Sequence, residues 1–281
     1  MIDTAITVFV DNNEKSIIEF DWLARSWKYS RSCEMSDLIV FYNSEVSVGR
    51  LPRHKNIIYI PIKPISETEK LWADYRRINA TWYLTTPEAA FISKYRYILK
   101  TDNDVFLTKN FATFRPRLAT FGMSSYASNP AVANNLTRIS EEWGIKQHLI
   151  NVGCTIMAPG EHVLVYVKNQ YEYCKRLKVT EFPDGKGEWP GWTSLVLNMY
   201  AGCLAANATF GNSMVLGGLD VLCMCKDQIG PTDYHIHAWH TNNFFSKHHW
   251  YKGEYDSIKS HDLNPEIISE YCLWIAGRRV A

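Results

Sequence analysis

Two carboxylates at the end of an apolar run are the residues of this chain whose types and spacing point most directly to chemistry. Asp102 and Asp104 flank Asn103 in the segment YRYILKTDNDVFLTKNF, residues 95–111. A carboxylate taken out of water must be paired or bound to a metal, so a buried strand rarely ends in two acids. At the carboxyl end of a strand in an α/β sheet, however, such a pair faces the ligand crevice, and its oxygens suit Mg²⁺ or Mn²⁺. The alternative interpretation is a solvated turn, because Thr-Asp-Asn-Asp is also turn and capping chemistry.

A cluster of histidines near the end of the sequence is the second chemical feature. The segment HIHAWHTNNFFSKHHWYKGEY begins at residue 235 and holds most of the 9 histidines of the chain. In a strand, His235 and His237 share a face, whereas His240 falls on the other face or beyond the strand end. Imidazole is a ligand for Mn²⁺-type ions, and Lys247 offers a point charge for a diphosphate. The alternative is a surface cluster, or core histidines that are satisfied by hydrogen bonds.

The elements that must position these residues alternate between strands and helices. Apolar runs predict strands at 5–10, 37–42, 56–62 and 97–101, and helical spacing predicts helices at 16–29 and 71–86. Pro87 opens a further short helix. This alternation predicts an α/β fold with a mostly parallel sheet flanked by helices.

The second half of the sequence has a looser pattern. The polar stretch SSYASNPAVANNLTR, residues 124–138, predicts an ordered loop or a lid, and the Gly- and Pro-rich stretch at 181–192 predicts a loop. Strands are expected at 150–158 and 234–240, and helices at 161–178 and 193–207. No internal repeat or low-complexity linker interrupts the chain, so residues 1–281 are expected to form a single domain.

Composition excludes some classes of protein. The chain has 281 residues with 30 basic and 29 acidic side chains and a net charge of +1, which does not indicate a nucleic-acid or anionic-membrane surface. The N-terminus lacks the pattern of a signal peptide, and no apolar stretch has the length of a membrane span, so a cytoplasmic protein is expected. The 7 cysteines are scattered and are expected to be free thiols, and Cys223 and Cys225 alone form a weak zinc motif.

The two chemical features, taken in chain order, resemble the GT-A class of nucleotide-sugar glycosyltransferases. The resemblance rests on the segments AITVFVDNN, LWADYRRINATWYL, TDNDVF, NVGCTIMAP and HTNNFFSKHHW. The third is similar to the D-x-D motif of that class, and the last is similar to the late His and Lys of glycogenin-like transferases. The spacing of the last segment departs from the pattern of those enzymes.

The resemblance implies roles for particular residues. Its implied metal ligands are Asp104, Asp102 and one histidine. Asp102 also bridges to the ribose or the sugar of the donor. The histidine is His240 or His237, and His240 is preferred because it is closer to Lys247 in the sequence. The implied contacts with the nucleotide-sugar donor come from Val10, Asp11, Arg76, Arg77, Asn79, Asp102, Asn103 and Lys247. Residues 1–111 are the implied nucleotide-sugar-binding half, and residues 112–281 the acceptor-side half with the C-terminal metal and diphosphate segment.

The expected activity is therefore the Mn²⁺- or Mg²⁺-dependent transfer of a sugar from a nucleoside-diphosphate sugar, with UDP-sugar preferred, to a hydroxyl of a glycan acceptor. For inversion the candidate bases are Asp184, Glu188 and Asp220, whereas a retaining enzyme would use the leaving phosphate and a polar side chain such as Asn151. The late His and Lys favour retention by analogy. The segment at 240–250 is expected to close over the diphosphate.

Two alternatives stay open at this point. A sugar-1-phosphate nucleotidyltransferase would also hold a metal on a similar sheet, but the sequence DNNEKS after the first strand contains no glycine-rich loop. A non-catalytic carbohydrate-binding protein would account for the tryptophans but not for the acids, His and Lys in this order.

Overall fold

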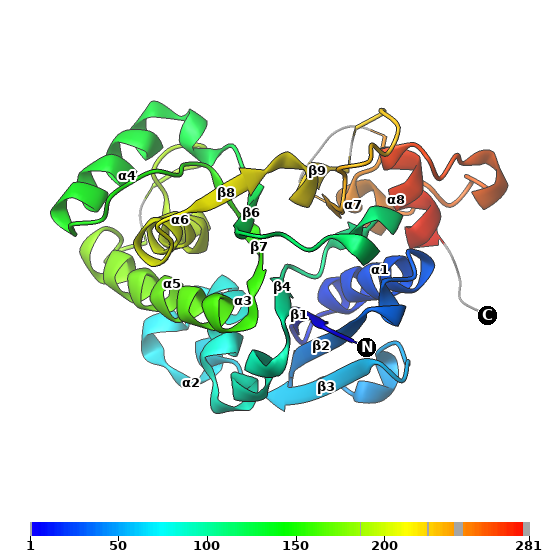
Figure 1. The fold of residues 1–281 in the computed structure, drawn as a ribbon, viewed down its shortest axis with the longest axis horizontal. Coiled ribbons are helices and arrows are strands. Elements are labelled where there is room, and N and C mark those ends of the chain that lie inside the picture. The colour runs from blue at the N-terminus through cyan, green and yellow to red at the C-terminus, as the bar shows by residue number, and fades with distance from the viewer. Residues whose placement is uncertain (1, 186, 224, 239–243, 278–281) are drawn as a thin grey trace.

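The computed structural model describes residues 2–185, 187–223, 225–238 and 244–277. Its central feature is a seven-stranded sheet with helices on both faces, and a three-stranded sheet lies beside it (Figure 1). The seven strands lie in the order β3 (Ile57–Ile62), β2 (Ser36–Asn43), β1 (Thr4–Val10), β4 (Tyr97–Lys100), β7 (Val152–Pro159), β6 (Ala119–Met123) and β8 (Ser213–Leu216). The small sheet has the order β5 (Val105–Leu107), β10 (His235–His237) and β9 (Val221–Leu222).

The large sheet is mostly parallel, as the sequence predicts. Strand β1 pairs in parallel with β2 and β4, and β2 pairs in parallel with β3. Strand β7 runs antiparallel to both β4 and β6. All seven residues of β1 are buried and most are apolar, which is the composition of a parallel strand covered on both faces. The α/β fold class and the mostly parallel sheet are confirmed.

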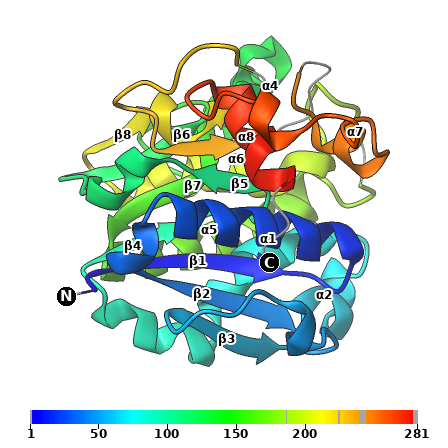
Figure 2. The ribbon, with the colours of Figure 1, turned by 90° about the vertical axis from the view of Figure 1, so that its right-hand side faces the viewer.

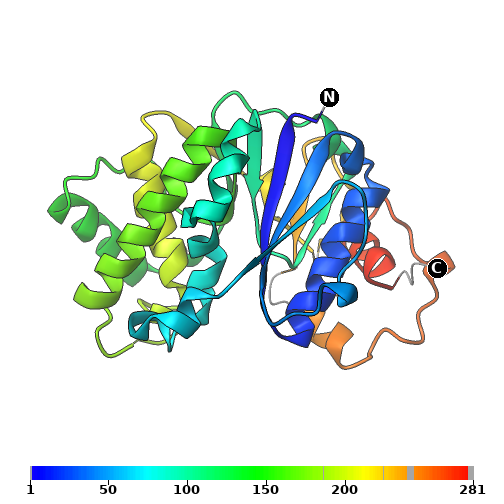
Figure 3. The ribbon, with the colours of Figure 1, turned by 90° about the horizontal axis from the view of Figure 1, so that it is seen from below.

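The helices form two layers around this sheet. They are α1 (Glu14–Tyr29), α2 (Ile65–Thr68), α3 (Asn79–Trp82), α4 (Pro130–Glu142), α5 (Gly160–Thr180), α6 (Leu197–Thr209), α7 (Lys247–Tyr251) and α8 (Ile268–Gly277). Helices α5 and α6 pack together on one face, and α1 lies along β1 on the other, with α8 beyond it (Figures 2 and 3). No helix among the described residues has the length and apolar character needed to cross a membrane.

One apolar core joins the two halves of the chain. It contains Phe9 and Ile98 from the first half and Phe121 and Leu204 from the second. Side chains from both sides of the boundary between residues 111 and 112 therefore pack in one core. The assignment of separate donor and acceptor roles to the two halves stays a prediction.

The prediction of one continuous helix at 71–86 is wrong. The segment consists of 3₁₀ turns and the four-residue α3. Trp72, Tyr75 and Ile78 are all buried. Their constant spacing of three residues fits the three residues per turn of a 3₁₀-helix better than the 3.6 of an α-helix.

The predicted loop at 124–138 is also wrong in its second part, where α4 begins. Asn129 caps this helix by accepting a hydrogen bond from the N–H of Ala131 at 2.9 Å, and Pro130 occupies the first turn. An Asn–Pro pair before buried residues at helical spacing, Val132 and Leu136 among them, is a helix start signal. Strands β6 and β8 were not expected, because they are short and are paired by distant segments.

Candidate active site

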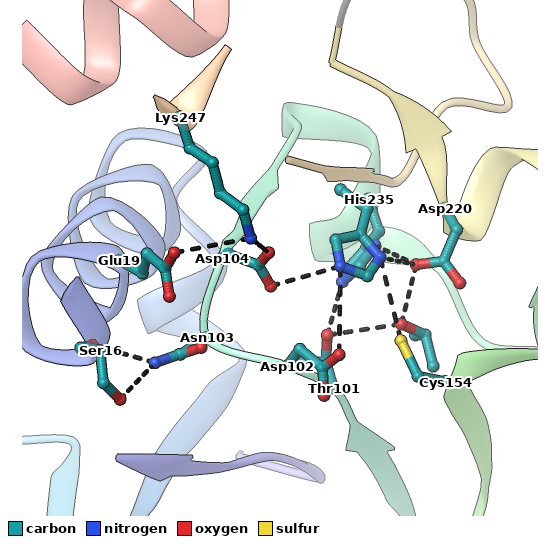
Figure 4. Close-up of polar contacts among 12 residues, drawn as sticks. Ser16, Glu19, Thr101, Asp102, Asn103, Asp104, Cys154, Asp220, His235 and Lys247 are labelled. Atoms are coloured by element: carbon teal, nitrogen blue, oxygen red, sulfur yellow. Dashed lines mark hydrogen bonds and ion pairs between the residues drawn. The ribbon is translucent and has the colours of Figure 1, made fainter. Parts of the chain in front are cut away.

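The acid pair lies where β4 ends at the carboxyl edge of the parallel strands. The last parallel contact is the Thr101 N–H bonded to the Thr7 carbonyl at 3.1 Å, after which the chain turns and β5 begins. Asn103 fixes this turn to the start of α1, because its amide donates to the Ser16 carbonyl at 2.9 Å and to the Ser16 hydroxyl at 2.7 Å. Figure 4 shows the Asn103 side chain directed to Ser16, with the side chains of Asp102 and Asp104 on the side away from Ser16. The Asp102 side chain is 30% exposed and that of Asp104 is 10% exposed, so the pair faces inward but is reachable through Asp102.

Strand pairing brings His237 to the acids across the chain. Strand β10 runs antiparallel to β5, with His237 opposite Val105, and the N–H of Ala238 bonds to the carbonyl of Asp104 at 2.9 Å. This register puts His237 Nε2 at 3.2 Å from Asp104 Oδ1 and at 4.0 Å from Asp102 Oδ2. The structure therefore brings together three of the predicted metal ligands. The other candidate, His240, lies outside the described residues.

A fully buried carboxylate, that of Asp220, contacts both histidines of β10. Asp220 Oδ1 lies 3.3 Å from Nδ1 of both His235 and His237 and accepts a hydrogen bond from the Thr155 hydroxyl at 2.9 Å. Thr101 lies 2.7 Å from His235 Nε2 and completes the network. Each polar side chain of this network supports the orientation of the next.

Two glycines make room for this buried carboxylate. A Cβ at Gly122 would lie 1.7 Å from Asp220 Oδ2, and a Cβ at Gly153 would lie 2.5 Å from the same oxygen. Any side chain at either position would therefore displace Asp220. The glycine of the predicted N-x-G segment is explained by this close approach.

Lys247 brings a positive charge to the acid pair. It is the first residue of α7, and its ammonium contacts Asp104 and lies 3.6 Å from Glu19 of α1. Glu19 in turn accepts a hydrogen bond from the Tyr251 hydroxyl at 2.6 Å. Figure 4 shows Lys247 reaching between Glu19 and Asp104. Sequence reasoning did not find Glu19, because it lies on a helix without a motif.

The pKa values of the cluster are set by two opposing effects, the burial of the ionisable groups and the opposite charges close to them. Burial raises the pKa of Asp104, but the charges of Lys247 and His237 outweigh it and hold that pKa well below its usual range. Burial likewise opposes ionisation of Asp220, and the close side chains of His235 and His237 lower its pKa to about 2. The pKa of His237 is raised well above its usual value, because Asp104 overcomes the effect of burial. The site thus holds buried, matched charges, which are characteristic of functional sites.

The predicted donor contacts on the 71–86 segment lie apart from this cluster. Asn79 is buried, and its amide bonds to both the N–H and the hydroxyl of Ser66, at 3.2 and 2.9 Å. Arg76 lies on the surface, 3.8 Å from Glu67, and Arg77 donates to the carbonyl of Leu195. The structure does not join these three residues to the acid pair.

The remaining predicted residues lie around the carboxyl edge of the sheet. Val10 ends β1 in the core, and the amide of Asn43 donates to Asp11 Oδ1 at 3.4 Å. Asn151 has a φ of 55° and accepts a hydrogen bond from the N–H of Ala127 at 2.7 Å through its side-chain oxygen. Asp184 and Glu188 are exposed on the loop that follows α5.

The residues around the acid pair fit a divalent metal ion of the kind that the resemblance implies. Nε2 of His237 faces the carboxylates of both Asp102 and Asp104, and Asp220 holds the second ring nitrogen of His237. A ligating histidine almost always has its other nitrogen bonded to such an acceptor, which fixes the ring. The chemistry of this donor set is the observation that supports a metal here.

The sheet order, the carboxyl-edge acids and the second sheet together define a GT-A-like fold, and solved structures agree. An active-site mutant of LgtC has a TM-score of 0.53 at 9% identity, with 90% of this chain and 95% of that chain covered. The galactosyltransferase LgtC in complex with donor and acceptor sugar analogs has a TM-score of 0.50 at 11% identity, with 85% and 90% covered. At such identities the likeness shows the fold alone.

A third solved structure, the apo form of the bifunctional glycosyltransferase WbbM, has a TM-score of 0.50 at 12% identity. The match covers 98% of this chain but 50% of that one, so the chain spans about half the length of WbbM. No curated protein matches the sequence. The chain belongs to the family described as Domain of unknown function (DUF7164), which matches residues 1–274.

Proposed function

We propose that this protein is a metal-dependent glycosyltransferase, which moves a sugar from a nucleoside-diphosphate sugar, with UDP-sugar the expected donor, to a hydroxyl of a glycan acceptor. The observation that carries the proposal is the cluster of Asp102, Asp104, His237 and Lys247 at the carboxyl edge of a GT-A-like sheet. Ligands of α/β sheets bind at this edge. A non-catalytic carbohydrate-binding protein would not explain why the acids, the histidine and the lysine meet in this arrangement.

The chemistry of the leaving group explains why these residues are needed. When the bond between the sugar and the diphosphate breaks, negative charge develops on the β-phosphate oxygen. A divalent cation, Mn²⁺ or Mg²⁺ in this proposal, supplies positive charge at that point when it is bound. Asp102, Asp104 and His237 would hold it, and the Lys247 ammonium would exchange its contact with Asp104 for one with the diphosphate.

The buried Asp220 has a positioning role in this proposal, which replaces the role of general base. Its side chain is 0% exposed, so an acceptor hydroxyl cannot approach within the roughly 3 Å that proton transfer requires. Its contacts with His235 and His237 instead fix the rings. Asp184 and Glu188 stay candidates for the base of an inverting reaction, because their loop is exposed.

Retention is the preferred stereochemical outcome, by analogy with transferases that have a late His and Lys. Asn151 directly precedes β7, the strand that pairs with β4, and its hydrogen bond from the N–H of Ala127 uses only the oxygen of its amide. The amide nitrogen would then be directed to the donor sugar. The expected localisation stays cytoplasmic.

A panel of nucleotide sugars tests the proposed function. Purified protein is incubated with UDP- and GDP-sugars in the presence of Mn²⁺ or Mg²⁺, and release of the nucleoside diphosphate is measured with and without glycan acceptors. Metal-dependent donor hydrolysis or transfer supports the proposal. Pyrophosphate exchange with a sugar 1-phosphate would indicate a nucleotidyltransferase instead, and binding of sugars without turnover would indicate a carbohydrate-binding protein. His237→Ala is the matched inactive control.

A further inference from the structure

A thiol lies beside the acid pair and was not part of the predicted site. Cys154 Sγ is 3.9 Å from Nδ1 of His237. One carboxylate oxygen of Asp102, the sulfur of Cys154 and one ring nitrogen of His237 all lie within 4.8 Å of one another. Figure 4 shows Cys154 on the side of the cluster that faces Asp220. These three side chains come from β7, β10 and the turn after β4, so the fold assembles a mixed S, N and O donor set.

The spacing of this donor set is close to that of a metal centre. Zinc bonds of roughly 2.0–2.3 Å in a tetrahedron place the donor atoms roughly 3.3–3.7 Å apart. The donor atoms lie within 4.8 Å of one another, so their separations would contract by up to about 1 Å. The metal would bind Nε2 of His237, the nitrogen that faces both acids. The sulfur lies beside Nδ1, so rotation of the Cys154 side chain would bring it toward Nε2, and rotation of the Asp102 side chain would bring the carboxylate.

Buried groups already fix two of the three donors. Asp220 Oδ1 holds Nδ1 of His237 at 3.3 Å, which leaves Nε2 directed to the acids. The buried ammonium of Lys100 donates to the carbonyl of Cys154 at 3.1 Å and so fixes the backbone that carries the thiol. These supports are independent of the sulfur itself.

Asp104, the carboxylate that would compete with Cys154 as third ligand, is less available to a metal. As long as no diphosphate draws the Lys247 ammonium away, its contact with Asp104 competes with a metal for the same carboxylate. Thiolate ligands favour borderline ions such as Zn²⁺ and Co²⁺, whereas Mg²⁺ and Mn²⁺ favour oxygen. The identity of the third ligand therefore determines which ion the site selects.

We propose that Cys154 is a further metal ligand beside Asp102 and His237, so that the site binds thiolate-accepting divalent ions such as Zn²⁺ and Co²⁺ more tightly than the Mn²⁺ or Mg²⁺ of the proposed function. Binding forms bonds from the metal to the sulfur and to Nε2 of His237, and it releases the thiol proton and the Nε2 proton to water. A role of this metal in turnover rests on the proposed function. The binding of the metal itself does not, because it is measured without donor or acceptor.

Titration of the metal-free full-length protein with Co²⁺ tests this proposal. We expect one equivalent to produce an intense sulfur-to-cobalt charge-transfer absorption in the near ultraviolet, and Zn²⁺ to abolish it by displacement. Cys154→Ser should lose this absorption and bind Co²⁺ roughly 100-fold or more weakly, since even the loss of a residue behind a ligand costs roughly 10–100-fold. Asp102→Asn, at a partly exposed side chain, should weaken binding and keep the sulfur signal at saturation.

The matched control is Cys225→Ser. Cys225 is also partly exposed, and its sulfur lies 2.9 Å from Asp227 Oδ2, so it is a thiol with a carboxylate nearby but outside the proposed donor set. This variant should keep the full signal. If Cys154→Ser fails to fold by circular dichroism, Cys154→Ala serves as the second variant. A signal unchanged in a folded Cys154 variant, or absent from the wild type at saturating Co²⁺, overturns the proposal. The absence of nucleotide-sugar turnover with the cobalt signal intact would instead reject the proposed function alone.

Discussion

Two regions of the molecule carry charged side chains where the sequence suggests contacts with a donor. One is the cluster around residues 101–104 and 235–237, and the other is the segment around Arg76 and Arg77. In the cluster the charges are buried and matched, as in the contacts of Asp104 with His237 and Lys247. On the segment they are exposed, and the Arg76 side chain is 65% exposed at 3.8 Å from Glu67. A buried charge destabilises the fold unless it is compensated, so its presence requires a structural or functional reason. An exposed charge requires none, and a motif there carries much less weight.

The largest effect is expected at Asp104. We expect Asp104→Asn to lower metal-dependent donor turnover by roughly 100-fold or more, because it removes a proposed ligand and the partner of Lys247. It should also lower the free energy of unfolding by about 3 kcal/mol, since the partner charges stay buried. Turnover assays and denaturant unfolding measure both effects. Asp262→Asn, at an exposed acid, is the control and should change neither. Near-normal turnover in Asp104→Asn would remove this residue from the site.

A smaller loss is expected when the support of His237 is removed. Asp220→Asn keeps the shape of the side chain but presents an amide to two histidine rings. We expect the affinity for the metal to fall by roughly 10–100-fold, as for other residues that orient a ligand. Isothermal calorimetry measures this affinity. Gly153→Ala should act in the same direction, because its Cβ would displace the Asp220 carboxylate. Wild-type affinity in both variants would show that the orientation of His237 does not depend on Asp220.

Lys247 is expected to act on the donor more than on the fold. We expect Lys247→Met to raise the KM for a nucleotide sugar by roughly tenfold, which corresponds to about 1.4 kcal/mol. The loss of a charge-assisted contact with the diphosphate is the physical reason. Lys252→Met provides the control, because Lys252 is exposed and pairs with Glu254. A variant of Lys247 with unchanged KM would place the lysine in a structural role with Asp104 and Glu19.

The smallest effects are expected on the exposed segment. Adjacent residues of a 3₁₀ turn point about 120° apart, so at most one of Arg76 and Arg77 faces a bound donor. We expect Arg77→Ala to weaken donor binding by roughly fivefold or less, and Arg76→Ala to have little effect, since surface charge contacts contribute about 0–1 kcal/mol. Donor titrations with each variant measure this difference. A loss as large as that for Asp104→Asn would remove the contrast between the two regions.

The sequence predicts the first four strands of the large sheet and the long helices α1 and α5 close to their observed bounds. These elements are long runs with one period, so the local pattern suffices to identify them. The local pattern predicts the structure less well where a segment is short or where its apolar spacing fits more than one kind of element. The 71–86 segment has buried residues at a spacing of three and forms 3₁₀ turns, and the polar stretch after residue 124 leads into α4.

The position of the acid pair at a strand end was determined by the sequence alone, because the apolar runs on both sides of it are local. The rest of the cluster was decided by tertiary structure. The register of β10 on β5 selects His237, and the hydrogen bond between Thr101 and His235 joins residues 134 positions apart. Glu19, Cys154 and the positioning role of Asp220 depend on the same long-range packing. No local pattern encodes such contacts, because each is set by the sheet order and by which side chains are buried together.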